Sequence, residues 1–176
     1  DEGRSNELTE WGMAAPLIVS DSGYGDAAEY RLGLAERGLS YVVQVTGRIN
    51  AYPVQTQREA APYKGVGSYP ELRYRDPAPN LRELVLDLGP AAARTVTWRD
   101  GSRHRVGQPV PIRSRFVFTR VQSAGRVMLT AHRGQDLPEA WLIAEWPPGA
   151  DESTKYWLSN LPATTSQRRL VRWAKL

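Results

Sequence analysis

Two short apolar runs separated by an amphipathic stretch stand near the start of the sequence. Residues 15–20 (APLIVS) and 39–47 (LSYVVQVTG) are rich in β-branched residues and bounded by turn formers, a pattern typical of buried strands. Residues 26–38 (DAAEYRLGLAERG) predict a helix that ends at a glycine, with Asp26 and Glu29 at capping-box spacing. A strand–helix–strand unit of this length favours two parallel strands joined by a right-handed crossover.

The pattern changes at the end of this unit. Residues 48–79 contain five prolines and show no period, which predicts an extended loop with a short strand at residues 72–75. Residues 80–89 (NLRELVLDLG) predict a short helix with Asn80 as its N-cap and Gly89 as its stop.

Short strand patterns separated by turn signals fill most of the remaining chain. They are RTVTW, RHRV, SRFVFTRV, RVMLTA, AWLIAEW and KYWLSN. Their regular spacing predicts an antiparallel, β-rich region. The last segment, TTSQRRLVRWAKL, predicts a helix with a capping box formed by Thr164 and Gln167. Together these elements predict an α/β fold.

Composition narrows the chemistry. The chain has no cysteine, which excludes disulfides and thiolate metal sites and leaves carboxylates as the plausible metal ligands. No apolar run approaches the roughly 18 residues of a membrane span, so we expect no membrane partner. A cytoplasmic location fits these features.

Basic residues concentrate in one span. Between residues 94 and 133, Asp100 is the only acidic residue. The basic side chains of that span are Arg94, Arg99, Arg103, Arg105, Arg113, Arg115, Arg120, Arg126 and Arg133, with His104 and His132 among them. Because guanidinium groups form forked hydrogen bonds to phosphate, this stretch is a candidate surface for a polyanion such as DNA. An ordinary solvated face is the alternative, and charge alone favours it.

Two aspartates flank the turn after the first predicted strand. Asp26 stands where a helix is predicted to begin, so a structural capping role is favoured for it. Asp21 directly follows a buried strand, the place where ligands and catalytic groups of α/β sheets gather, and its carboxylate could reach into a crevice there. A residue that only starts the turn is the alternative for Asp21, and the pattern leaves both interpretations open. No other carboxylate has a spacing that pairs it with Asp21.

Several blocks of the sequence resemble the DDE-type transposases of bacterial insertion sequences. These blocks are PLIVSDSGYGDAAEYRLGLAERGLSYVVQV, TVTWRDGSR, LPEAWLIAEWPPG and TKYWLSNLPATTSQRRLVRWAKL. The resemblance implies a partial ribonuclease-H-like core, in which Asp21 is the second acid of a metal-binding triad. It also implies that the first acid precedes this chain and that the third, a glutamate, follows it. The chain would then be an internal fragment that is catalytically incomplete by itself.

The resemblance further implies a division of the chain and a role for each part. Residues 1–47 would belong to the core, residues 48–154 would form a loop and a β-rich insertion, and residues 155–176 would return to the core. In the full-length form, two Mg²⁺ (or Mn²⁺) ions held by Asp21 and the other acids would serve the cutting and joining of DNA in transposition.

The same resemblance implies partners and a location. Transposon ends and target DNA would be the substrates, a homodimer would be the full-length form, and the bacterial nucleoid would be the location. The insertion would hold DNA through its arginines, with tryptophans stacking on an extruded base. The tryptophans in question are Trp98, Trp141, Trp146 and Trp157. A DNA-binding module without enzymatic activity, using the same arginines, is the alternative function.

Overall fold

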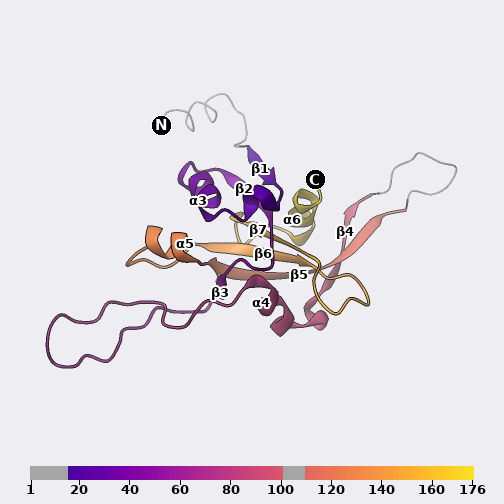
Figure 1. The fold of residues 1–176 in the computed structure, drawn as a ribbon. Coiled ribbons are helices and arrows are strands. Elements are labelled where there is room, and N and C mark those ends of the chain that lie inside the picture. The colour runs from indigo at the N-terminus through magenta and orange to yellow at the C-terminus, as the bar shows by residue number, and fades with distance from the viewer. Residues whose placement is uncertain (1–15, 101–109) are drawn as a thin grey trace.

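A computed structural model of the chain describes residues 16–100 and 110–176. In these residues seven strands form one mixed sheet in the order β1-β2-β7-β6-β5-β3, and β4 also pairs with β5 (Figure 1). The strands are β1 (Leu17–Ser20), β2 (Ser40–Val45), β3 (Ala51–Pro53), β4 (Arg94–Arg99), β5 (Ile112–Ser123), β6 (Glu139–Glu145) and β7 (Lys155–Ser159). The helices are α2 (Ser22–Gly25), α3 (Ala28–Glu36), α4 (Leu81–Leu88), the 3₁₀ turn η1 (Pro90–Ala92), α5 (Arg126–Ala131) and α6 (Gln167–Ala174).

The predicted strand–helix–strand unit is present. β1 and β2 are parallel, with Ile18 opposite Tyr41, and α2 and α3 connect them. Gly38 follows α3 with a φ of 66°, as expected of a glycine that ends a helix. β1 and β2 are the parallel pair, and the pairs of β2 with β7, β7 with β6 and β6 with β5 are antiparallel.

Both faces of the sheet carry helices. On one face, α3 and α4 cover a cluster that includes Val43 of β2, Leu142 of β6 and Leu158 of β7. On the other face, Leu170 and Val171 of α6 pack against a second cluster of residues. Adjacent residues of one strand point to opposite faces, so the continuous apolar run of β2 is buried on both sides.

The β-rich region is antiparallel, as its pattern predicts. β4, β5, β6 and β7 continue the same sheet, because β7 pairs with β2 through the register Val43↔Leu158. The segment RHRV lies at residues 103–106, outside the described residues. The helix predicted at residues 80–89 is confirmed as α4, with a reciprocal capping box between Asn80 and Glu83.

Three predictions about helical segments and their caps are wrong. RVMLTA forms the helix α5 instead of a strand, because Gly125 turns the chain at a φ of 109° and Met128 is then buried against the end of the sheet. The N-cap of α6 is Ser166, which accepts a hydrogen bond from the Arg169 amide, and not Thr164. Asp26 does not cap α3, because the chain forms the extra turn α2 first and α3 then begins after Ala27 without a side-chain cap.

The proline-rich stretch forms a long arm. Residues 54–79, here called the arm, leave the sheet after β3 and return before α4, and they extend far from the sheet (Figure 1). Instead of the strand predicted at residues 72–75, the arm contains one isolated backbone bridge between Glu59 and Arg73. Among the described residues, none of the helices has the length and apolar character needed to span a membrane.

Candidate functional site: the carboxylate at the end of β1

Asp21 lies at the carboxyl end of β1, where the sequence places it. It is the N-cap of α2, and its Oδ1 accepts a hydrogen bond from the Gly23 amide at 3.0 Å. The side chain is exposed to solvent. Asp21 therefore starts the turn, as the structural interpretation holds, and it also presents a carboxylate beside the parallel pair β1–β2, as the functional interpretation requires.

The turn that carries Asp21 packs tightly on β2. Gly25 is buried, and a Cβ atom at that position would lie 1.9 Å from the carbonyl oxygen of Gln44. No side chain fits there, because the obstacle is backbone on the neighbouring strand. Glycine at position 25 thus allows the backbone of α2 to lie directly against the backbone of β2.

Two charged side chains fix the same turn. Arg31 is only 2% exposed, and its guanidinium donates a hydrogen bond to the carbonyl oxygen of Gly25. Burial lowers the pKa of Arg31, while the nearby Tyr41 and Asp26 raise it. Asp26 accepts a hydrogen bond from the Thr46 amide at 2.7 Å, which ties the end of α2 to the end of β2. Asp26 is therefore structural, as predicted, but it joins the end of α2 to the end of β2 instead of capping α3.

Sequence reasoning missed Arg31 and Gly25. Arg31 directly follows Tyr30 and precedes Leu34, two apolar residues of α3 that pack on the core. The charge of Arg31 beside these two apolar residues was the one feature of the sequence that could have indicated a buried arginine. Gly25 is one of two glycines in the turn. Nothing in the local sequence shows that Gly25 packs against the backbone of β2 while Gly23 does not.

The described residues do not form a complete metal site. Mg²⁺ and Mn²⁺ are bound by several oxygen ligands. Among residues 16–100 and 110–176, no three side chains of His, Asp, Glu or Cys come together in a way that could hold an ion. Surface hollows lie beside α6, at the end of β2 and beside α5, and Asp21 lines none of them, so the crevice expected at Asp21 is not among them. The site as described contributes one carboxylate.

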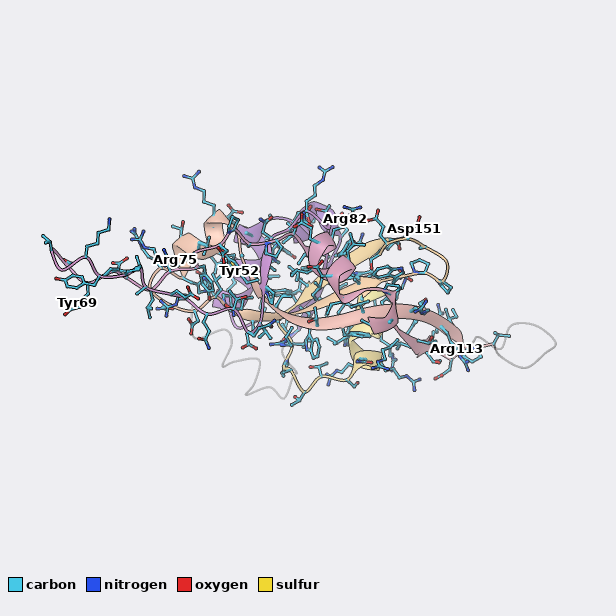
Figure 2. All side chains as sticks on the ribbon, turned by 90° about the horizontal axis from the view of Figure 1, so that it is seen from below. Tyr52, Tyr69, Arg75, Arg82, Arg113 and Asp151 are labelled. Carbon is cyan, nitrogen blue, oxygen red and sulfur yellow. The ribbon has the colours of Figure 1, made fainter. Side chains whose placement is uncertain are left out.

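The predicted arginine surface is divided between the faces of the sheet. In the β4–β5 register, Arg94 lies opposite Phe116, whereas Arg113 lies opposite Thr97. Because positions 113 and 116 are an odd number of residues apart, Arg94 and Arg113 point to opposite faces. Arg126 begins α5, at the other end of β5 from Arg113 (Figures 1 and 2).

Several of these arginines also have partners within the fold. Arg115 donates to the carbonyl oxygen of Pro90 at 2.9 Å. Arg120 lies over the Trp141 ring, 5.1 Å from its centroid, and donates to Glu139 at 3.3 Å. Arg99 is exposed at the end of β4, and Arg103 and Arg105 lie outside the described residues. The described arginines are thus dispersed and do not make one stripe.

The tryptophans are mostly covered. Trp146 is 2% exposed, and its indole N–H donates to the carbonyl oxygen of Ala150, so it is a core residue that offers no ring face to a base. Trp157 is also buried in the core. Trp141 donates to the carbonyl oxygen of Pro162 at 3.0 Å while its ring contacts Arg120. The expectation that Trp146 stacks on DNA is therefore corrected.

Comparison with known proteins places the chain in a family. The family model of DDE superfamily endonucleases matches residues 5–105, a span that includes Asp21, the β1–β2 pair and α4. No curated protein matches the sequence. The matched span is more than half of the chain. The chain therefore belongs to the DDE superfamily endonucleases, and it carries a DDE-type transposase domain.

Proposed function

We propose that this chain serves in DNA transposition, as part of an enzyme that cuts and joins DNA strands, and that Asp21 is one of its catalytic acids. Membership of an endonuclease family supports DNA as the substrate. The observation that carries the proposal is the exposed Asp21 carboxylate at the end of a parallel strand, on a turn fixed by Gly25, Arg31 and Asp26.

The role of Asp21 would be to bind a divalent cation. Mg²⁺ or Mn²⁺, when bound, supplies Lewis-acid chemistry at phosphate. One carboxylate does not make such a site, so further ligands would come from residues outside the described ranges. What the described residues do is hold one oxygen ligand in a fixed position, since the turn that bears it is locked against β2.

Manganese broadening of NMR signals tests this role. Mn²⁺ relaxes nearby nuclei strongly, so even weak binding at Asp21 broadens the amide signals of residues 20–25. We expect that broadening in the wild-type chain and its loss in Asp21→Asn. Asp87→Asn, which changes an exposed carboxylate on α4, serves as the matched control and should leave the broadening intact. Equal broadening in wild type and Asp21→Asn would refute the role of Asp21.

The finer features of the resemblance form part of the same proposal. They are a ribonuclease-H-like core within residues 1–47, an inserted region over residues 48–154, a return over residues 155–176, and an origin in a bacterial insertion sequence. A homodimer as the full-length form, a nucleoid location and the fragment status of this chain also belong to it. The parallel β1–β2 pair beside antiparallel strands supports the core assignment.

The alternative of a DNA-binding module without chemistry is less well supported. It would depend on the arginines of residues 94–126 acting together. The described members of that set point to both faces of the sheet, and Arg115 and Arg120 are engaged in contacts inside the fold. We therefore keep the catalytic proposal as the function that the geometry supports best.

A further inference from the structure

The arm has an anchored base. Gln122 of β5 donates hydrogen bonds from its Nε2 to the carbonyl oxygens of Val54 and Thr56, both at 2.8 Å. The Tyr74 ring stacks on the Tyr52 ring, with centroids 4.7 Å apart, and the Tyr74 hydroxyl also contacts Gln122. Both sides of the arm are thus tied to the sheet, so its direction is set by the fold.

The two sides of the arm also hold each other. The backbone amides of Glu59 and Arg73 donate to each other's carbonyl oxygens at 2.9 and 3.0 Å. Arg58 forms an ion pair with Asp136 at 2.8 Å, which joins the arm to the segment before β6. Beyond the Glu59–Arg73 pair, the chain runs out to the tip, where Tyr69 lies far from the sheet (Figure 2).

The tip presents a preformed aromatic stack. The rings of Tyr63 and Tyr69 are 4.4 Å apart and inclined by 22°, and the Tyr63 hydroxyl donates to the carbonyl oxygen of Gly67. Gly65 and Gly67 have φ values of 77° and 86°, which turn the chain so that the two rings meet. Tyr69 is 80% exposed and Val66 is 86% exposed. Tyr63 therefore supports Tyr69 from one side, while most of the Tyr69 ring remains open to a partner.

The charge of the tip suits a polyanion. Lys64 is the only charged residue from position 60 to position 70, and Glu71, the next acid along the chain, forms an ion pair with Arg73 at 3.1 Å. The apolar surface of the tip amounts to Val66 and two tyrosines, far less than the roughly 800 Å² per partner of a stable protein interface. A lysine beside an open aromatic ring is instead the combination that binds unpaired nucleotides, with stacking on the base and charge at the phosphate.

We propose that the tip of the arm binds DNA at an unpaired base, which stacks on Tyr69, with Lys64 at the adjacent phosphate. This inference rests on the proposed DNA function and adds an interaction surface to it, remote from Asp21. It also moves the base-stacking role from the covered tryptophans to an exposed tyrosine.

Fluorescence anisotropy with two labelled DNAs tests the inference. One is a short duplex, and the other is the same duplex with a central unpaired segment. Loss of one stacked base weakens binding by roughly tenfold, so Tyr69→Ala should lower affinity for the unpaired DNA on the order of tenfold and change duplex affinity little. Tyr69→Trp should retain the affinity, because its ring also stacks. Lys64→Ala should reduce the slope of log affinity against log salt by about 0.7 to 0.9.

Controls separate this inference from the proposed function. Leu129→Ala removes an exposed apolar side chain on α5, outside the tip of the arm, and should leave both affinities unchanged. Wild-type binding with an unchanged affinity in Tyr69→Ala would overturn the arm inference alone. Loss of a dimer in Tyr69→Ala, seen by sedimentation without a change in DNA affinity, would overturn it in favour of a second copy as the partner. Failure of the wild-type chain to bind either DNA would overturn both the inference and the DNA function.

Discussion

Gly25→Ala is the sharpest perturbation of the turn that carries Asp21. The new methyl group would lie 1.9 Å from the carbonyl oxygen of Gln44 and 3.3 Å from the Cβ atom of Val43. An ordinary contact between carbon and a carbonyl oxygen is about 3.3 Å, so α2 and β2 would have to separate by roughly 1.4 Å. Both obstacles belong to β2, which is hydrogen-bonded on both sides, so the movement would fall on α2.

The energetic cost follows from what that movement breaks. Overpacking of a tight contact costs about 1–3 kcal/mol. The hydrogen bond from Thr46 to Asp26 spans this gap, whereas the one from Arg31 holds the Gly25 carbonyl oxygen of α2 to α3, and a hydrogen bond to a charged group contributes about 1.5–3 kcal/mol. A shift of α2 relieves the overpacking but weakens the hydrogen bonds, so the two costs do not add in full. We therefore expect the free energy of unfolding to fall by about 2–4 kcal/mol in total. For a chain of this size, that corresponds to a Tm lower by about 5–15 °C.

Urea unfolding followed by tryptophan fluorescence measures the loss, and a second glycine provides the control. Gly33 lies inside α3, where a Cβ atom would come 3.0 Å from the end of the flexible Arg37 side chain. Gly33→Ala should leave stability unchanged or raise it by up to about 1 kcal/mol, since alanine favours a helix. Gly25→Ala should also weaken Mn²⁺ broadening at Asp21. If Gly25→Ala were as stable as wild type, the close packing of α2 on β2 would be refuted.

Two further predictions concern buried ionisable groups. Burial raises the pKa of Tyr41 and of Tyr156, so the folded state holds these protons more tightly than the unfolded state. The resulting stability is fully present below the usual tyrosine pKa of about 10 and is lost as the pH rises above it. The urea midpoint of unfolding should therefore fall as the pH rises above about 10, and it should fall less steeply in Tyr41→Phe. A urea midpoint that does not change with pH would contradict this prediction. The Lys175 ammonium donates to both carboxylate oxygens of Glu145 at 2.7 Å and lies near three aromatic rings. Lys175→Met should therefore lower the free energy of unfolding by about 3 kcal/mol, because it leaves the Glu145 carboxylate poorly solvated and without its partner. The double variant with Glu145→Leu should recover most of that loss in the same urea assay, and an additive loss would show that the pair is not coupled.

The parts of the fold that were predictable are those whose signals are local. The runs at residues 15–20 and 39–47 are short, β-branched and bounded by turns, so they indicate strands without knowledge of their partners. The predicted burial is confirmed for β2 but wrong for β1, which lies at the end of the described sheet and leaves Val19 38% exposed. Asn80 and Glu83 form the capping box of α4, and both members lie within one turn. The strand predicted for residues 126–131 (RVMLTA) was wrong because a short apolar run fits a strand and a helix equally well. The burial of Met128, a contact outside the run, decides in favour of the helix.

The part of the site that was not predictable depends on distant contacts. Asp26 has the local spacing of a cap, but its carboxylate binds the Thr46 amide, twenty residues later. Arg31 reaches the Gly25 carbonyl oxygen only because α3 folds back along α2. A position at the end of a strand could be inferred for Asp21, whereas the contacts that fix its turn could not.

The arginine span shows why a charge cluster in sequence need not become a charged surface. Side chains alternate between faces along a strand, so the register between neighbouring strands decides which of their arginines share a face. Arg94 and Arg113 are separated in this way. Tyr63 and Tyr69 show the reverse, since they belong to no periodic pattern, yet the turn at Gly65 and Gly67 brings their rings to 4.4 Å. Because stacking needs an open ring face and charge alone does not supply one, the arm is a stronger candidate for base contact than the region with more arginines.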